Sequence, residues 1–119
     1  MFEGLRRFLR YAVGYRTITV ESESAHKLIL SCWPTRTVFD SKKGQISQNG
    51  IALAALSAIE RVEVHQPPNQ DSTVNWYLTI HMKSVVNPIQ VGQTTDPVEA
   101  SIIAARISSF TGRPVTARV

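Results

Sequence analysis

Hydrophobic and polar residues alternate along much of the chain, and this alternation predicts short β-strands. The clearest case is residues 74–84, where Trp76, Leu78, Ile80 and Met82 occupy every second position. Successive side chains of a strand point to opposite faces of the sheet, so this spacing indicates a strand with one buried face. The same pattern predicts strands over residues 16–22, 26–33, 35–41, 58–66 and 87–93.

Residues 51–58 (IALAALSA) do not fit one element. Alanine and leucine favour a helix, but the stretch is short and no capping residue precedes it. We therefore predict a strand or a single turn that leads into the strand at 58–66. The total of six or seven strands, joined by short polar turns, is typical of an antiparallel meander rather than of βαβ units.

One amphipathic helix is predicted after the strands, over residues 97–111. Asp96 is a suitable N-cap, the proline after it fits the first helical position, and Glu99 would complete a capping box. Gly112, with a proline two residues later, supplies a stop signal, and residues 113–119 form a short tail. The apolar residues that recur at helical spacing are Ala100, Ile103, Ala104, Ile107 and Phe110. We expect this stripe to cover apolar surface that the strands leave open.

The N-terminal residues form a separate amphipathic segment. Over residues 2–13 one helical side is apolar, and the other side carries one glutamate and three arginines. The apolar side consists of Phe2, Leu5, Phe8, Leu9, Ala12 and Val13, and the charged side consists of Glu3, Arg6, Arg7 and Arg10. We therefore predict a short N-terminal helix and divide the chain into an arm (residues 1–14) and a single domain (residues 15–119).

Composition agrees with an ordinary globular protein. The chain has 119 residues, of which 43% are hydrophobic, and 13 Lys/Arg against 9 Asp/Glu give a net charge of +4. The only cysteine, Cys32, excludes an internal disulfide framework and favours a reducing cytoplasm. No apolar run is long enough to span a bilayer, and no signal peptide is evident. We expect a cytoplasmic protein, with peripheral attachment to the inner membrane as the alternative.

Residues that could carry chemistry are few. The three histidines show no metal-ligand spacing. His65 and His81 could lie on neighbouring strands. Glu63 or Asp71 could then join them in a metal or acid–base site, but solvent-facing sheet positions explain them more simply. Cys32 alternates with leucines, which indicates a buried small side chain rather than a nucleophile. We predict no catalytic residue, no metal and no cofactor.

Four segments are similar to those of a known fold family. They are SCWPTRTVFD (31–40), AIERVEV (58–64), NWYLTIHM (75–82) and TTDPVEASIIAARISSFTGRPV (94–115). Together they resemble the pleckstrin-homology (PH) superfold, and in particular small bacterial PH-like domains, over residues 15–115. The resemblance implies a binding or scaffolding module, built as an antiparallel six- to seven-stranded sandwich or partly open barrel that is closed by the C-terminal helix. The loop at 21–27 holds two glutamates and one lysine, which departs from the members that bind phosphoinositides.

We predict a non-catalytic module that acts through protein–protein contact and associates with itself. The resemblance implies that an extended peptide can add to an edge strand beside the C-terminal helix. The candidate interaction surface consists of Arg6, Arg7, Arg10, Arg36, Lys42 and Lys43. The first alternative is attachment to an anionic membrane through the basic arm. The second, nucleic-acid binding, rests on the basic surplus and on Trp33, Tyr77 and Tyr15 as stacking residues, and we disfavour it because no nucleic-acid-binding motif accompanies them.

Overall fold

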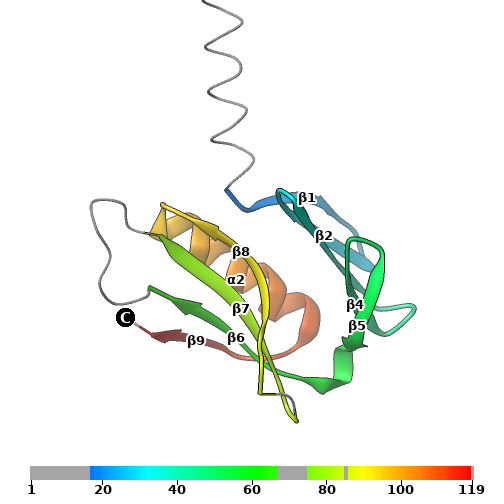
Figure 1. Ribbon diagram of the computed structural model, residues 1–119. Helices are drawn as coiled ribbons and strands as arrows, with labels where there is room; N and C mark the ends of the chain where they lie inside the picture. Colours follow the sequence, from blue (N-terminus) through cyan, green and yellow to red (C-terminus); the bar gives the residue numbers. More distant parts are fainter. Residues whose placement is uncertain (1–16, 67–74, 85, 119) are drawn as a thin grey trace, which may run out of the picture.

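Two β-sheets and one helix make up the part of the protein that the structure describes (Figure 1). The structure is a computed structural model, and it describes residues 17–66, 75–84 and 86–118. The N-terminal arm, Asp71 and the last residue lie outside these ranges. Neither sheet closes on itself within them, so the arrangement is a sandwich rather than a barrel.

The first sheet is an antiparallel meander in the order β1-β2-β3-β4-β5. Its strands are β1 (Thr19–Glu23), β2 (Lys27–Cys32), β3 (Thr35–Asp40), β4 (Gln45–Gln48) and β5 (Ile51–Ala55). A two-residue turn joins β4 to β5, with positive φ angles at Asn49 (50°) and Gly50 (83°). Asn-Gly is the pair that such hairpin turns favour, because both residues tolerate positive φ. A short 3-10 helix, η1 (Leu56–Ala58), then leads into the second sheet.

The second sheet has the order β8-β7-β6-β9. Its strands are β6 (Ile59–His65), β7 (Trp76–Met82), β8 (Ile89–Thr94) and β9 (Val115–Arg118). The first three are antiparallel neighbours, whereas β9 pairs with β6 in parallel. The prediction of an entirely antiparallel meander is therefore wrong at this edge.

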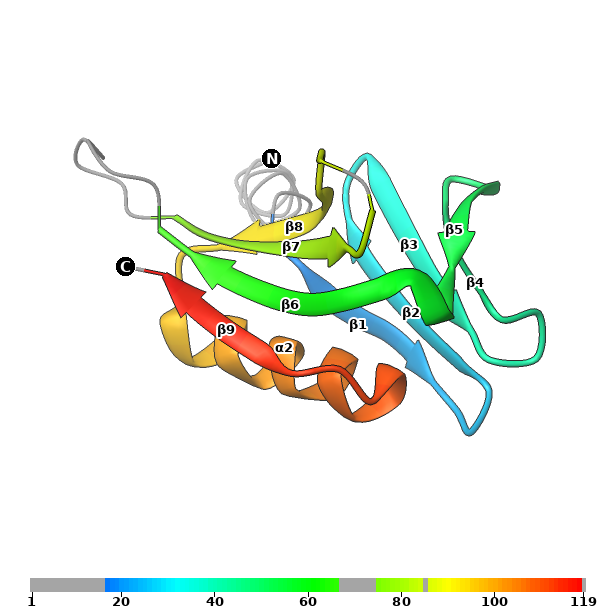
Figure 2. The ribbon, with the colours of Figure 1, turned by 90° about the horizontal axis from the view of Figure 1, so that it is seen from below.

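Helix α2 (Pro97–Thr111) connects β8 to β9 and covers one face of the second sheet (Figure 2). Asp96 caps it as predicted, because its side chain accepts a hydrogen bond from the Val98 amide (2.9 Å). Gly112 ends it in the left-handed conformation at φ 72°. The helix also reaches the first sheet, where the Phe110 ring lies edge-on to Phe39 at 6.4 Å between centroids. It thus closes the side of the sandwich where both sheets bury apolar residues.

The core confirms the predicted apolar faces. Ile18, just before β1, is fully buried, and so are the strand residues Leu28, Leu30, Phe39, Ile46, Ile59, Val62, Leu78, Ile80 and Val91. Four of the five predicted helix positions, Ala100, Ile103, Ala104 and Ile107, are buried as well, and Phe110 packs against them. No helix among the described residues combines the length and hydrophobicity that crossing a bilayer requires.

Two strands were not predicted. β4 has four residues and only one apolar side chain, Ile46, so it shows no alternation. β9 lies in the predicted tail, and in the structure its residues Val115, Thr116 and Ala117 are exposed. The ambiguous segment at 51–58 forms both of the alternatives, a strand followed by a single turn.

Candidate functional site

The most exposed apolar strand of the described structure is β5, at the edge of the first sheet. Its sequence, IALAA, contains no charged residue and no proline. Ile51 is 67% exposed and Leu53 44% exposed. Within the described ranges β5 pairs only with β4, and a bulge at Leu53 interrupts that pairing. β5 therefore combines a free backbone edge with an apolar surface.

An edge of this kind can bind another strand. Unpaired backbone N–H and C=O groups form a row that an extended chain can extend, and natural proteins commonly block such rows with charges or prolines. β5 has neither a charge nor a proline, and its one protective feature is the bulge at Leu53. The chemistry available here is strand addition combined with contact to Ile51 and Leu53.

A second candidate is a groove at the seam between the two sheets. It has a volume of about 320 Å³ and lies between the β2–β3 turn and β8. Its lining consists of Cys32, Trp33, Pro34, Thr35, Gln90, Val91, Gly92 and Gln93, all of them uncharged. Trp33 is 61% exposed, and a large exposed aromatic side chain is typical of a contact residue.

The sheets approach closely beneath this groove. A Cβ atom placed on Gly92 would lie 2.8 Å from Cys32 Cβ and 3.0 Å from Ile18 Cβ. The Ile18 amide donates to the Gln93 carbonyl (2.8 Å), and Gln48 Nε2 donates to the Gln90 carbonyl (2.9 Å). These two carbonyls of β8 therefore already accept hydrogen bonds from the chain itself.

Cys32 is half-buried, whereas the sequence predicted a buried side chain. It packs against the core, and burial raises its pKa, an effect that the Gln93 amide partly opposes. A raised pKa keeps the thiol protonated and poorly nucleophilic.

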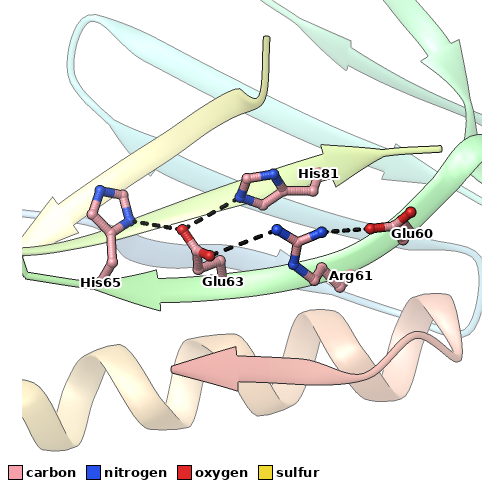
Figure 3. Close-up of polar contacts among 5 residues, drawn as sticks. All are labelled: Glu60, Arg61, Glu63, His65 and His81. Carbon is pink, nitrogen blue, oxygen red and sulfur yellow. Dashed lines mark hydrogen bonds and ion pairs between the residues drawn. The ribbon is translucent and has the colours of Figure 1, made fainter. Parts of the chain in front are cut away.

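A polar cluster lies on the face of the second sheet opposite α2 (Figure 3). The register pairs Arg61 with His81, so Glu63 lies between His65 on its own strand and His81 on β7. Glu63 is 7% exposed, and its Oε1 atom lies 3.4 Å from His65 Nδ1 and 3.3 Å from His81 Nε2. Arg61 pairs with Glu60 and lies 3.8 Å from the second carboxylate oxygen of Glu63.

The sequence left open whether His65 and His81 lie close to Glu63, and in the structure both do. One carboxylate oxygen lies within ion-pair distance of two imidazole nitrogens. Among the residues described, no three His, Cys, Asp or Glu side chains are placed to hold a metal ion. His65 also stacks on Tyr77, with ring centroids 5.7 Å apart. These contacts join side chains of β6 to side chains of β7, which gives the cluster a structural role.

Of the predicted basic surface, the structure describes Arg36, Lys42 and Lys43. Arg6, Arg7 and Arg10 lie outside the described residues. Arg36, at the start of β3, forms an exposed ion pair with Glu21 (2.9 Å).

Lys42 and Lys43 lie in the turn beyond the other end of β3, and the four residue steps from Arg36 to Asp40 span about 13 Å. Both lysine amides donate to Asp40 Oδ1 at 3.0 Å. The two lysines therefore share one turn, and Arg36 belongs to a different end of the sheet.

Two further expectations can be compared with the geometry. The edge strands of the second sheet, one of which was expected to accept a peptide beside the C-terminal helix, are β8 and β9, and both contact α2. The proposed stacking residues are also separated: Trp33 lies in the β2–β3 turn, Tyr77 lies on β7 against His65, and Tyr15 lies outside the described residues.

The described residues thus form a β-sandwich with a C-terminal helix, an apolar strand edge, an aromatic-rimmed groove and a polar cluster. No protein-family model, no curated protein and no solved structure matches the chain.

Proposed function

We propose that the chain is a non-catalytic, PH-like binding module that acts through protein–protein contact and associates with itself. The PH-like assignment is supported by the succession of antiparallel strands and by α2, which follows them and packs against both sheets. The non-catalytic assignment is supported by the structural roles of Cys32 and of the Glu63 cluster.

The observation that carries self-association is β5. Two copies of IALAA in antiparallel register place Leu53 opposite Leu53 and Ile51 opposite Ala55. Every facing pair is then apolar, and cross-strand pairs of this kind stabilise a sheet by about 0.2–1 kcal/mol each. Molecules that each carry a net charge of +4 repel one another, so an uncharged strand is the favourable place for contact.

Analytical ultracentrifugation of the full chain, combined with light scattering, tests this proposal. We expect a concentration-dependent dimer that Leu53→Lys converts to monomer, because the twofold axis sets the two lysines opposite each other. Val98→Lys is the matched control, since Val98 is 64% exposed on α2.

A charge swap tests the register itself. An equimolar mixture of Leu53→Lys and Leu53→Glu chains should form a heterodimer, whereas each variant alone stays monomeric. A wild-type chain that remains monomeric at high concentration, or a dimer that survives Leu53→Lys, would contradict the proposal.

A further inference from the structure

We infer that the groove at the seam between the two sheets binds a neutral sugar residue of an oligosaccharide. The groove lies between the β2–β3 turn and β8, and its volume of about 320 Å³ is at the lower end of the range for pockets that hold small ligands. The inference goes beyond the proposed self-association, because none of the described residues that line the groove belongs to β5.

The lack of charge in the groove restricts the class of ligand. Every described side chain that lines it is uncharged. An ionised group that enters such a site loses hydration and gains no counter-charge, which disfavours phosphates, carboxylates and amines. The groove therefore suits a neutral ligand.

The hydrogen-bonding side chains of the groove match hydroxyl groups. Thr35, Gln90 and Gln93 line it, and within the described part of the chain no hydrogen bond occupies their side chains. A threonine hydroxyl and a glutamine amide can each both donate and accept hydrogen bonds, as sugar hydroxyls do. Two backbone carbonyls of β8 already accept from the chain itself, whereas these three side chains are available to a ligand.

Trp33 supplies the apolar part of the site. It is 61% exposed, and Pro34 follows it in the same turn. An indole offers a flat apolar face, and a pyranose ring has a flat C–H face with hydroxyls around its edge. A sugar that stacks on Trp33 can therefore direct its hydroxyls toward the side chains of β8. A proline-rich peptide binds in grooves lined by several aromatic residues, whereas Trp33 is the one aromatic residue among the described lining.

The base of the groove is held in place, which favours binding without rearrangement. Cys32 pairs with Thr35 across the β2–β3 turn, and a Cβ atom placed on Gly92 would lie 2.8 Å from Cys32 Cβ. The Ile18 amide also donates to the Gln93 carbonyl at 2.8 Å. A site that is already ordered loses little conformational entropy when it binds a ligand.

Calorimetric titration of the full chain with neutral hexasaccharides tests this inference. The neutral probes are cellohexaose, maltohexaose and chitohexaose, hexagalacturonate is the charged counterpart, and decaproline represents the peptide alternative. All are measured at about 0.15 M salt, which screens the attraction of anions to a basic protein. We expect at least one neutral hexasaccharide to bind with a Kd of about 1 mM, and hexagalacturonate to bind at least about tenfold more weakly.

Two pairs of variants locate the binding. Trp33→Ala should weaken it about tenfold, whereas Val86→Ala, which truncates an exposed residue outside the groove, should leave it unchanged. Gln93→Ala should weaken it about fivefold, whereas Gln45→Ala, the same change on β4, should have no effect. In a Trp76→Phe chain Trp33 is the only tryptophan, so the fluorescence should change on binding.

Three results would overturn the inference: no binding of any neutral probe at about 10 mM, binding that survives Trp33→Ala, or equal binding of hexagalacturonate. Decaproline that binds through Trp33 would also overturn it and assign the groove to a peptide. The two proposals fail separately. Leu53→Lys breaks the expected dimer but leaves the groove intact, so it should still bind the sugar, and Trp33→Ala should sediment as the wild type does.

Discussion

Replacing Gly92 by alanine should destabilise the sandwich, because the two sheets approach closely at Gly92. The added Cβ would lie 2.8 Å from Cys32 Cβ and 3.0 Å from both Ile18 Cβ and Ile18 Cδ1. Two of these atoms are attached directly to backbone, so they cannot rotate away. Either the sheets separate by several tenths of an ångström or the contacts remain compressed.

The cost can be worked from these contacts. Overpacking a well-packed interior costs about 1–3 kcal/mol. Glycine to alanine elsewhere gains about 0.4–1 kcal/mol through the unfolded chain, when the backbone conformation suits alanine. The net loss expected for Gly92→Ala is therefore about 1–2 kcal/mol, which lowers the melting temperature of a chain of this size by about 5–10 °C.

Urea unfolding followed by circular dichroism measures the loss, and a double-mutant cycle identifies its cause. Ile18→Val removes the Cδ1 atom and should cost about 1 kcal/mol in the wild-type background. In the Gly92→Ala background it should cost less, because it also relieves one of the close contacts. A Gly92→Ala chain as stable as the wild type, or strictly additive effects, would refute the close packing of the seam.

Two other predictions concern the charged residues. The Lys43 amide, with help from the Lys42 amide and nearby lysine charges, lowers the Asp40 pKa below its ordinary value of 3.8. The ionised carboxylate therefore stabilises the fold at pH values above 3.8. This contribution is lost as the pH falls through the lower pKa of the folded state. Asp40→Asn should therefore flatten the decline of the urea midpoint between about pH 5 and pH 2. Glu63→Ala should lower the free energy of unfolding by about 1–3 kcal/mol, because it removes the buried acceptor that two imidazoles face. Glu60→Ala on the same strand should change it by less than about 1 kcal/mol, since that ion pair is exposed, and equal effects would argue against a stabilising role for the cluster.

The strands and the helix that the sequence predicted well are those whose burial is one-sided. β7 alternates over its whole length, and α2 carries a cap at each end as well as an apolar stripe. β4 and β9 each have four residues, too few for a period to be visible. β5 is apolar at every position, so its sequence does not distinguish a buried face from an exposed edge. That ambiguity concealed the strand on which self-association is now proposed.

The candidate sites depend on information that a single sequence carries only weakly. His65 and His81 are distant along the chain, and only the register of β6 against β7 sets them on either side of Glu63. The connection between those strands is long, and strand register is poorly specified when a hairpin turn does not fix it. Trp33 could be recognised as an aromatic residue before a proline, but its exposure follows from its place at the tip of a turn. The basic residues were grouped by composition, whereas the length of β3 separates Arg36 from Lys42.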